Sequence, residues 1–106
     1  MAIQISSELL DGCVLGILLH DDYYGYSLTQ KVQKSISVSE STMYPVLRRL
    51  KKNDLLSTYD ESYQGRNRRY YKITSEGKRQ FEMIKQDWQV FKGSIDKMLG
   101  DGVDHE

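Results

Sequence analysis

The feature that most restricts the fold is an apolar repeat in the last third of the chain, where large side chains recur at alternating steps of three and four residues. Its members are Phe81, Ile84, Trp88, Phe91, Ile95 and Met98. This is the a/d pattern of a heptad repeat, which places all six on one side of a helix. A helix from Ser75 to Leu99, capped by Thr74 or Ser75, would be about 37 Å long. The 74 residues before it are too few to cover that length. We therefore expect the six residues of the repeat to be dimerisation residues, with the free end of the helix packed against its twin in a homodimer.

Two further helices are predicted near the N-terminus. Residues 6–20 form the first, with Ser6 or Ser7 as its N-cap. Apolar residues surround most of this helix, which indicates burial on more than one face and again suggests a partner subunit. A turn at Gly25 leads to the second helix, over residues 27–36. The tyrosines between the two helices could stack on a ligand, but we interpret them as cover for the helix junction; they are Tyr23, Tyr24 and Tyr26.

Residues 39–53 predict a short third helix with two different faces. One side is apolar and consists of Met43, Val46, Leu47 and Leu50. Hydroxyl, aromatic and basic side chains occupy the other faces, namely Ser41, Thr42, Tyr44, Arg48, Arg49, Lys51 and Lys52. Pro45 lacks the N–H that would bond to Ser41, so we expect either a slight kink or a helix that begins with Ser41 as its cap. Asn53 and Asp54 can adopt the left-handed conformation that ends a helix.

Two strands joined by a polar loop are expected next. Residues 55–59 and 69–73 are rich in branched and aromatic side chains, which favour strands. Residues 60–68 are polar and predict a hairpin loop, with Gly65 near its tip. Two cations flank that tip, Arg66 and Arg68. They could be an ordinary solvated charge run, but a glycine there lets the backbone approach a groove, so we favour contact with a minor groove or with phosphates.

The order of these elements predicts the fold class. Three helices, a small β-hairpin and a long helix form a mainly α chain of the winged helix-turn-helix type, in which the third helix reads DNA and the hairpin is the wing. We expect residues 1–74 to form the DNA-binding domain, 75–100 the C-terminal dimerisation helix and 101–106 a frayed acidic tail.

The distribution of charge supports a nucleic-acid partner. The formal net charge is zero, with 15 basic and 15 acidic residues, which by itself argues against DNA binding. Between Pro45 and Lys72, however, eight basic residues face only three acids. A phosphate backbone responds to that local field rather than to the total charge.

Other classes of protein are poorly matched. The chain has a single cysteine, a start unlike a secretory signal and no apolar run near the roughly 20 residues of a membrane span, so we expect a cytoplasmic protein without membrane contact. His20 and His105 have no partners at ligand spacing, and we predict neither a metal nor a cofactor. An enzyme is not expected, because the chain lacks a nucleophile–base series, a phosphate loop and a carboxylate pair in a plausible cleft.

Several stretches of the chain match a known pattern. The combination is Thr42-x-Tyr44-Pro45 in the third helix and Gly65-Arg66-x-Arg68-x-Tyr70-Tyr71-x-x-Thr74 in the hairpin, together with residues 15–19, 24–28 and 55–56. On these residues the chain resembles the PadR family of bacterial transcriptional regulators, in its short form with one C-terminal helix. The resemblance runs from about residue 10 to residue 81. The family often has glycine where Asp54 stands, which leaves open how the third helix stops.

The resemblance implies a homodimeric repressor of operator DNA that is released by a small aromatic or hydrophobic effector. In some relatives a tryptophan of the long helix lines a cavity between the subunits, and Trp88 corresponds to it. The residues expected at such an effector site are Trp88, Leu10 and Cys13. From the residues alone, however, we favour ordinary buried roles for two of them, Trp88 in the dimer core and Cys13 as a small hydrophobe.

The sequence thus predicts a set of DNA contacts. Hydroxyls at a helix N-terminus favour phosphate, and an arginine one turn later can reach a groove. The expected DNA-binding residues are Ser41, Thr42, Tyr44, Arg48, Arg49, Lys52, Arg66 and Arg68. The competing hypothesis is a winged-helix protein-interaction module without DNA binding, which the basic third helix and hairpin disfavour.

Overall fold

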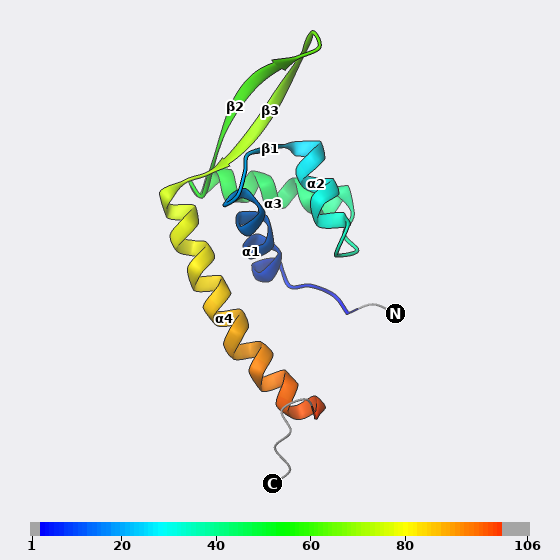
Figure 1. Cartoon of the computed structure of the whole chain (residues 1–106), viewed down its shortest axis with the longest axis vertical. Helices are drawn as coiled ribbons and strands as arrows, with labels where there is room; N and C mark the ends of the chain where they lie inside the picture. The colour runs from blue at the N-terminus through cyan, green and yellow to red at the C-terminus, as the bar shows by residue number, and fades with distance from the viewer. Residues whose placement is uncertain (1–2, 101–106) are drawn as a thin grey trace.

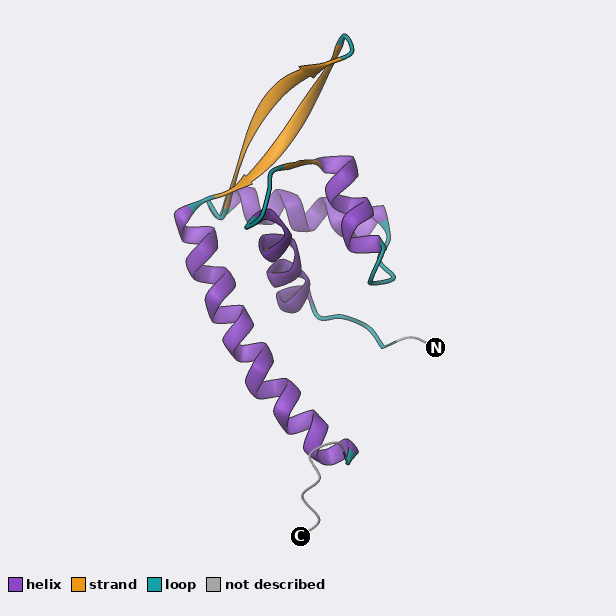
Figure 2. Cartoon of the chain, in the orientation of Figure 1, coloured by secondary structure: helices purple, strands orange, loops and turns teal. Residues whose placement is uncertain are grey.

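The computed structural model describes residues 3–100, which form four helices and a three-stranded antiparallel sheet (Figures 1 and 2). In chain order the elements are α1 (Ser7–Leu18), β1 (Tyr23–Tyr24), α2 (Gly25–Gln33), α3 (Glu40–Lys52), β2 (Leu56–Tyr63), β3 (Arg66–Ile73) and α4 (Ser75–Leu99). Helices α1 to α3 form a body from which the β2–β3 hairpin projects on one side, while α4 extends away on another (Figure 1). The predicted winged-helix class with a long C-terminal helix is confirmed. The acidic tail expected at 101–106 lies outside the described residues.

The helix ends show which of the predicted capping residues and helix bounds the structure has. Ser6 caps α1 by accepting a hydrogen bond from the Leu9 N–H at 3.1 Å, and Thr74 caps α4 by accepting one from the Gly77 N–H at 3.0 Å. Asp54, with φ of 62°, takes the expected left-handed conformation after α3. The predicted bounds of the second helix were wrong. It begins at Gly25 rather than residue 27, because Gly25 follows a short strand directly, and it ends at Gln33.

The hairpin differs most from the expectation. Residues 60–68, predicted as a loop, are mostly strand, and the connection is only Gln64 and Gly65, with φ of 50° and 76°. Two successive left-handed residues suit a two-residue hairpin turn, whose twist matches that of the strands. The strands pair in register from Leu56 with Ile73 to Tyr63 with Arg66. Their outer half has no buried residues, so the apolar alternation that identifies a strand was absent.

A single core joins these elements. Its buried apolar residues are Leu10, Val14, Leu15, Leu18, Leu28, Val32, Met43, Val46, Leu47, Leu50, Leu56, Ile73 and Ile84. They come from all the helices and from both long strands. The core therefore fixes how α3 and the base of the hairpin are placed relative to α1.

Two glycines bring α1 and α4 into close contact. A Cβ atom on Gly12 would lie 2.5 Å from the Ile84 Cγ2 atom, and one on Gly16 would lie 2.8 Å from the Phe81 Cε1 atom. Ile84 is accordingly buried and Phe81 is half-buried. The first two members of the heptad repeat thus pack against α1 within the chain, and the dimerisation role predicted for all six stays a prediction.

Candidate nucleic-acid interface

The exposed side of α3 carries hydroxyl, aromatic and basic groups in one row. Ser41, Thr42, Tyr44 and Arg48, which we call the reader face, are all exposed, and Tyr44 retains 46% of its surface. Their spacing of three and four residues keeps most of them on the same side of the helix. The opposite side is the buried row of Met43, Val46, Leu47 and Leu50. The core thus decides which face of α3 is presented.

The beginning of α3 is organised by Ser39 rather than by Ser41. The Ser39 hydroxyl oxygen accepts a hydrogen bond from the Thr42 N–H at 3.2 Å and lies 2.9 Å from the Ser41 hydroxyl and 3.1 Å from the Thr42 hydroxyl. The alternative of a cap at Ser41 was therefore wrong, and Pro45 stands inside the helix. Because Pro45 has no N–H, the Ser41 carbonyl loses its helical partner on the exposed side. Hydroxyls and amides at this helix N-terminus are well suited to phosphate oxygens.

Arg49 is directed away from the reader face. Its guanidinium forms an ion pair with Asp11 of α1, and both side chains are partly covered. Burial raises the pKa of the Asp11 carboxyl above its ordinary value, and the charge of Arg49 and its hydrogen bond oppose that rise. The DNA contact predicted for Arg49 remains a prediction, but the structure gives this residue a structural partner. Lys51 and Lys52 are exposed at the end of α3.

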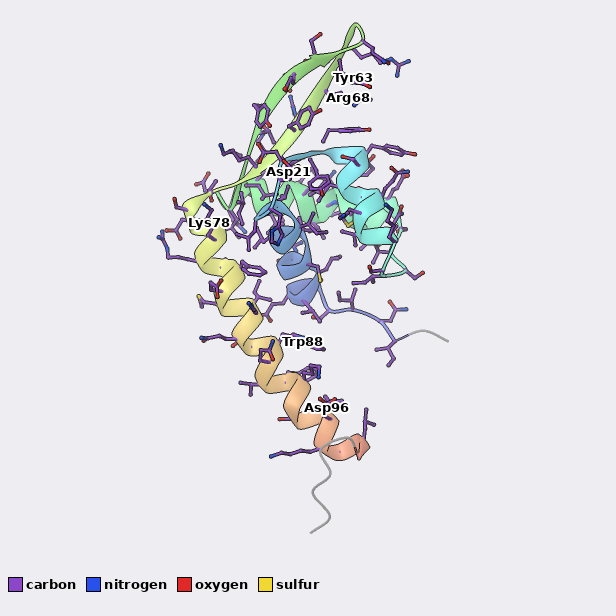
Figure 3. All side chains as sticks on the ribbon, viewed as in Figure 1. Asp21, Tyr63, Arg68, Lys78, Trp88 and Asp96 are labelled. Atoms are coloured by element: carbon purple, nitrogen blue, oxygen red, sulfur yellow. The ribbon has the colours of Figure 1, made fainter. Side chains whose placement is uncertain are left out.

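The arginines of the hairpin have three different environments. Arg66 is exposed beside the turn. Arg69 lies 3.4 Å from the Asp60 carboxylate across the strands. This ion pair weakens the attraction of Arg69 for an anionic ligand. The Arg68 guanidinium carbon lies 4.1 Å from the centre of the Tyr24 ring and 3.9 Å from that of Tyr63. Figure 3 shows Arg68 and Tyr63 together on the projecting hairpin.

The distal half of α4 presents an apolar surface that the described chain does not cover. Trp88, Phe91 and Met98 retain 36%, 60% and 75% of their surface, and Ile95 is half-buried. We call these four residues the apolar stripe. The Trp88 and Phe91 ring centres are 6.3 Å apart, and Figure 3 shows Trp88 on the part of α4 that extends beyond the body. An exposed patch of this kind marks an interaction site.

The three predicted effector residues lie in different environments. Leu10 is 2% exposed and belongs to the core, Cys13 is half-buried on α1, and Trp88 lies in the apolar stripe. Leu10 also borders a surface hollow of about 690 Å³ between the N-terminal segment and α3, but neither Trp88 nor Cys13 lines it. The effector site predicted for these residues therefore stays a prediction.

Some residues of this surface were not found by sequence reasoning. Asp11 holds Arg49 from 38 positions away, and Tyr24 and Tyr63 hold Arg68 from different elements. Tyr63 carried no usable signal, because it stood in a segment predicted as loop. Among residues 3–100 no three potential ligands from His, Cys, Asp and Glu gather as a metal site would require. Over the same residues, every helix is too short or too polar to cross a membrane.

Comparisons with known proteins agree with this architecture. Residues 14–83 match the transcriptional regulator PadR-like family. The protein smu.1704 of Streptococcus mutans has a similar crystal structure, with 35% identity, full coverage of both chains and a TM-score of 0.88. A PadR family transcription regulator from Clostridium difficile is 33% identical over 86% of this chain and 98% of its own, with a TM-score of 0.78. An uncharacterised protein X from Lysinibacillus sphaericus is 34% identical over 95 residues, which is 85% of this chain and 87% of the relative. With the family pattern covering the helix-turn-helix, the hairpin and the start of α4, the chain belongs to the transcriptional regulator PadR-like family.

Proposed function

We propose that the protein is a DNA-binding transcriptional regulator that acts as a homodimeric repressor. The observation that carries this proposal is the exposed reader face of α3, next to a hairpin with exposed basic residues, in a chain of the PadR-like family. Ser41 and Thr42 would bond phosphates, Tyr44 and Arg48 would reach the major groove, and Arg66 would extend the contact from the wing.

The apolar stripe supports the homodimer. A second copy would cover Trp88, Phe91, Ile95 and Met98 by the same residues of its own α4, which is the simplest way to remove them from water. A dimer would carry two reader faces related by a two-fold axis. It would then read two half-sites about 34–36 Å apart on a nearly palindromic operator.

Release by an effector is the finer part of the proposal. A planar aromatic or hydrophobic compound could stack on Trp88 between the two subunits, near Cys13 of α1. Such a compound would change DNA binding only if it bound two dimer geometries with unequal affinity. Trp88 is the only tryptophan, so quenching of its fluorescence by a panel of planar aromatics tests the site directly. A flat response over the whole panel would remove Trp88 as a sensor.

The regulator is tested by gel retardation with the DNA upstream of its own gene at several salt concentrations. We expect specific retardation that weakens steeply with salt, because phosphate contacts release counterions. Arg48→Ala should weaken binding by about 5- to 150-fold, as expected for loss of a groove contact of about 1–3 kcal/mol. Lys97→Ala is the matched control, since it also removes one exposed cation but lies at the far end of α4. Absence of specific retardation at every salt concentration would favour the protein-interaction module instead.

A further inference from the structure

Arg68 differs from the other cations of the hairpin because aromatic rings hold it. Its guanidinium carbon is 4.1 Å from the Tyr24 ring centre and 3.9 Å from the Tyr63 ring centre, which is well within cation–π range. Tyr24 belongs to β1 and caps α2, whereas Tyr63 is the last residue of β2. We call this pair of rings the tyrosine clamp. It joins the outer part of the hairpin to the helix-turn-helix.

Further tyrosines on the same side of the sheet tie the clamp to the body of the domain. Tyr24 meets Tyr70 edge-on with ring centres 5.8 Å apart, and Tyr70 stacks on Tyr59 at 5.5 Å. The Tyr59 hydroxyl donates a hydrogen bond of 2.7 Å to Asp22, just before β1. Strand pairing places Tyr59 opposite Tyr70, and Tyr70 opposite Tyr24. The hairpin is thus connected to the segment that leads into α2 by a continuous row of side chains.

The clamp fixes the position of Arg68 without neutralising it. Glu61 is its partner across the strands, yet within the described part of the chain no ion pair joins the two side chains. Arg69, the next residue, is paired with Asp60. Ring faces cover the flat sides of a guanidinium and leave its N–H edge able to donate. Arg68 therefore keeps a full charge and free donors in a fixed place.

A fixed arginine binds a phosphate better than a mobile one. Arginine has many rotamers, and a ligand must remove that freedom when it binds. The clamp has already removed that rotamer freedom in the free protein, so Arg68 is preorganised for binding. Because the rings hold the side chain along the sheet, it is not extended from the turn as Arg66 can be. A backbone phosphate is accordingly a better partner for Arg68 than a base edge deep in a groove.

We propose that Tyr24 and Tyr63 are positioning residues that present Arg68 as a preformed anchor for a DNA backbone phosphate, and that they set the angle of the wing relative to α3. This inference rests on the proposed DNA-binding function. It assigns to the two tyrosines a role in binding that acts through Arg68 rather than through contacts of their own.

The test is the DNA affinity of a set of variants over a series of salt concentrations. It is measured by fluorescence anisotropy with an upstream DNA fragment that the wild-type protein retards in the gel assay. Arg68→Ala should weaken binding and reduce the slope of log K against log salt by about 0.9, the value for one phosphate contact. Tyr63→Leu should weaken binding by about two- to fivefold, the range for one exposed cation–π contact. Its salt slope should equal that of the wild type, because Arg68 can still reach the phosphate. Tyr63→Phe keeps the ring and should bind like the wild type.

Two controls separate positioning from general damage to the fold. Tyr26→Leu removes another exposed tyrosine, 55% exposed, which stacks on Tyr24 with ring centres 6.5 Å apart but makes no cation–π contact with Arg68. Because Tyr24 keeps its own contacts with Arg68 and Tyr70, this variant should leave affinity unchanged. In the double variant Tyr63→Leu/Arg68→Ala the loss should equal that of Arg68→Ala alone, since the tyrosine acts only through the arginine. Additive losses, or wild-type affinity for Tyr63→Leu, would overturn the clamp while leaving the proposed regulator intact. A wild-type chain that binds no DNA at any salt concentration would overturn both.

Discussion

Replacement of Gly77 by alanine should destabilise the protein, although alanine normally stabilises a helix. Gly77 is the third residue of α4 and is buried at the point where α4 leaves the hairpin. A Cβ atom there would lie 2.2 Å from the Leu55 carbonyl oxygen and 2.7 Å from the Ile73 Cγ1 atom. The first distance is 1.2 Å short of the 3.4 Å at which ordinary contact begins. Backbone must therefore move, because the nearest atom is not a flexible side chain.

The size of the effect follows from what that movement disturbs. The Leu55 oxygen accepts a hydrogen bond from the Thr74 N–H at 3.1 Å, and the Thr74 hydroxyl donates one of 2.7 Å to the Asp54 carbonyl. Overpacking of a tight site costs about 1–3 kcal/mol, and weakening a hydrogen bond adds about 1 kcal/mol. The intrinsic preference of helices for alanine returns up to about 1 kcal/mol. We expect a net loss of about 2 kcal/mol, or about 8–16 °C in melting temperature for a domain of this size.

Gly93→Ala is the matched control in the same helix. No atom lies within 4 Å of the place where its Cβ would stand, and Gly93 falls at position f of the heptad repeat, away from the apolar stripe. Alanine there should raise the free energy of unfolding by roughly 0.5–1 kcal/mol. Thermal unfolding followed by circular dichroism, at one protomer concentration because a dimer melts in a concentration-dependent way, measures both. A Gly77→Ala protein that melts at or above the wild-type temperature would refute the packing argument.

Three further predictions test other parts of the structure. The hydrogen bond to Asp22 is the main cause that raises the pKa of Tyr59 to about 12. The stability that this hydrogen bond contributes should be complete below the ordinary tyrosine pKa of 10.0 and be lost as pH rises through about 12. In Asp22→Ala, which removes the acceptor, absorbance at high pH should show that tyrosine titrating at a lower pH than in the wild type, and an unchanged titration would contradict the assignment. Ile84→Ala should lower the free energy of unfolding by about 2–5 kcal/mol while light scattering shows the dimer retained, whereas loss of the dimer would place Ile84 in the subunit interface. Trp88→Asp should yield a folded monomer, and a dimer that survives this change would mean that the apolar stripe is not the interface.

Much of this architecture could be predicted from local pattern. The heptad repeat located α4 because a helical period is visible in the sequence itself. Its cap was narrowed to Thr74 or Ser75, and the structure shows Thr74. The apolar row of α3 likewise identified the exposed face that carries Arg48. The position of the hairpin in the chain could be predicted, but the length of its strands could not. Its outer residues are mostly polar and none is buried, so they lack the apolar alternation that distinguishes strand from loop.

The functional part of the surface depended on tertiary structure. By sequence, Arg48 and Arg49 are equivalent basic residues of one helix, and nothing in the sequence pairs Arg68 with aromatic rings. Folding leaves Arg48 exposed, pairs Arg49 with Asp11, and places Arg68 against two aromatic rings. Those partners come from segments that are distant along the chain, and no periodicity within one helix or strand reports them.

The same distinction between sequence and tertiary structure applies to α4, whose heptad repeat restricts the fold most. The sequence by itself determined that α4 is long and has one apolar side, because both properties depend only on the spacing of residues along a helix. Only the tertiary structure decided how that side is divided. Gly12 and Gly16 let α1 approach closely enough to bury Ile84 and half-bury Phe81. Beyond the end of α1 the described chain has no further surface to offer, so the remaining apolar residues stay open to a partner.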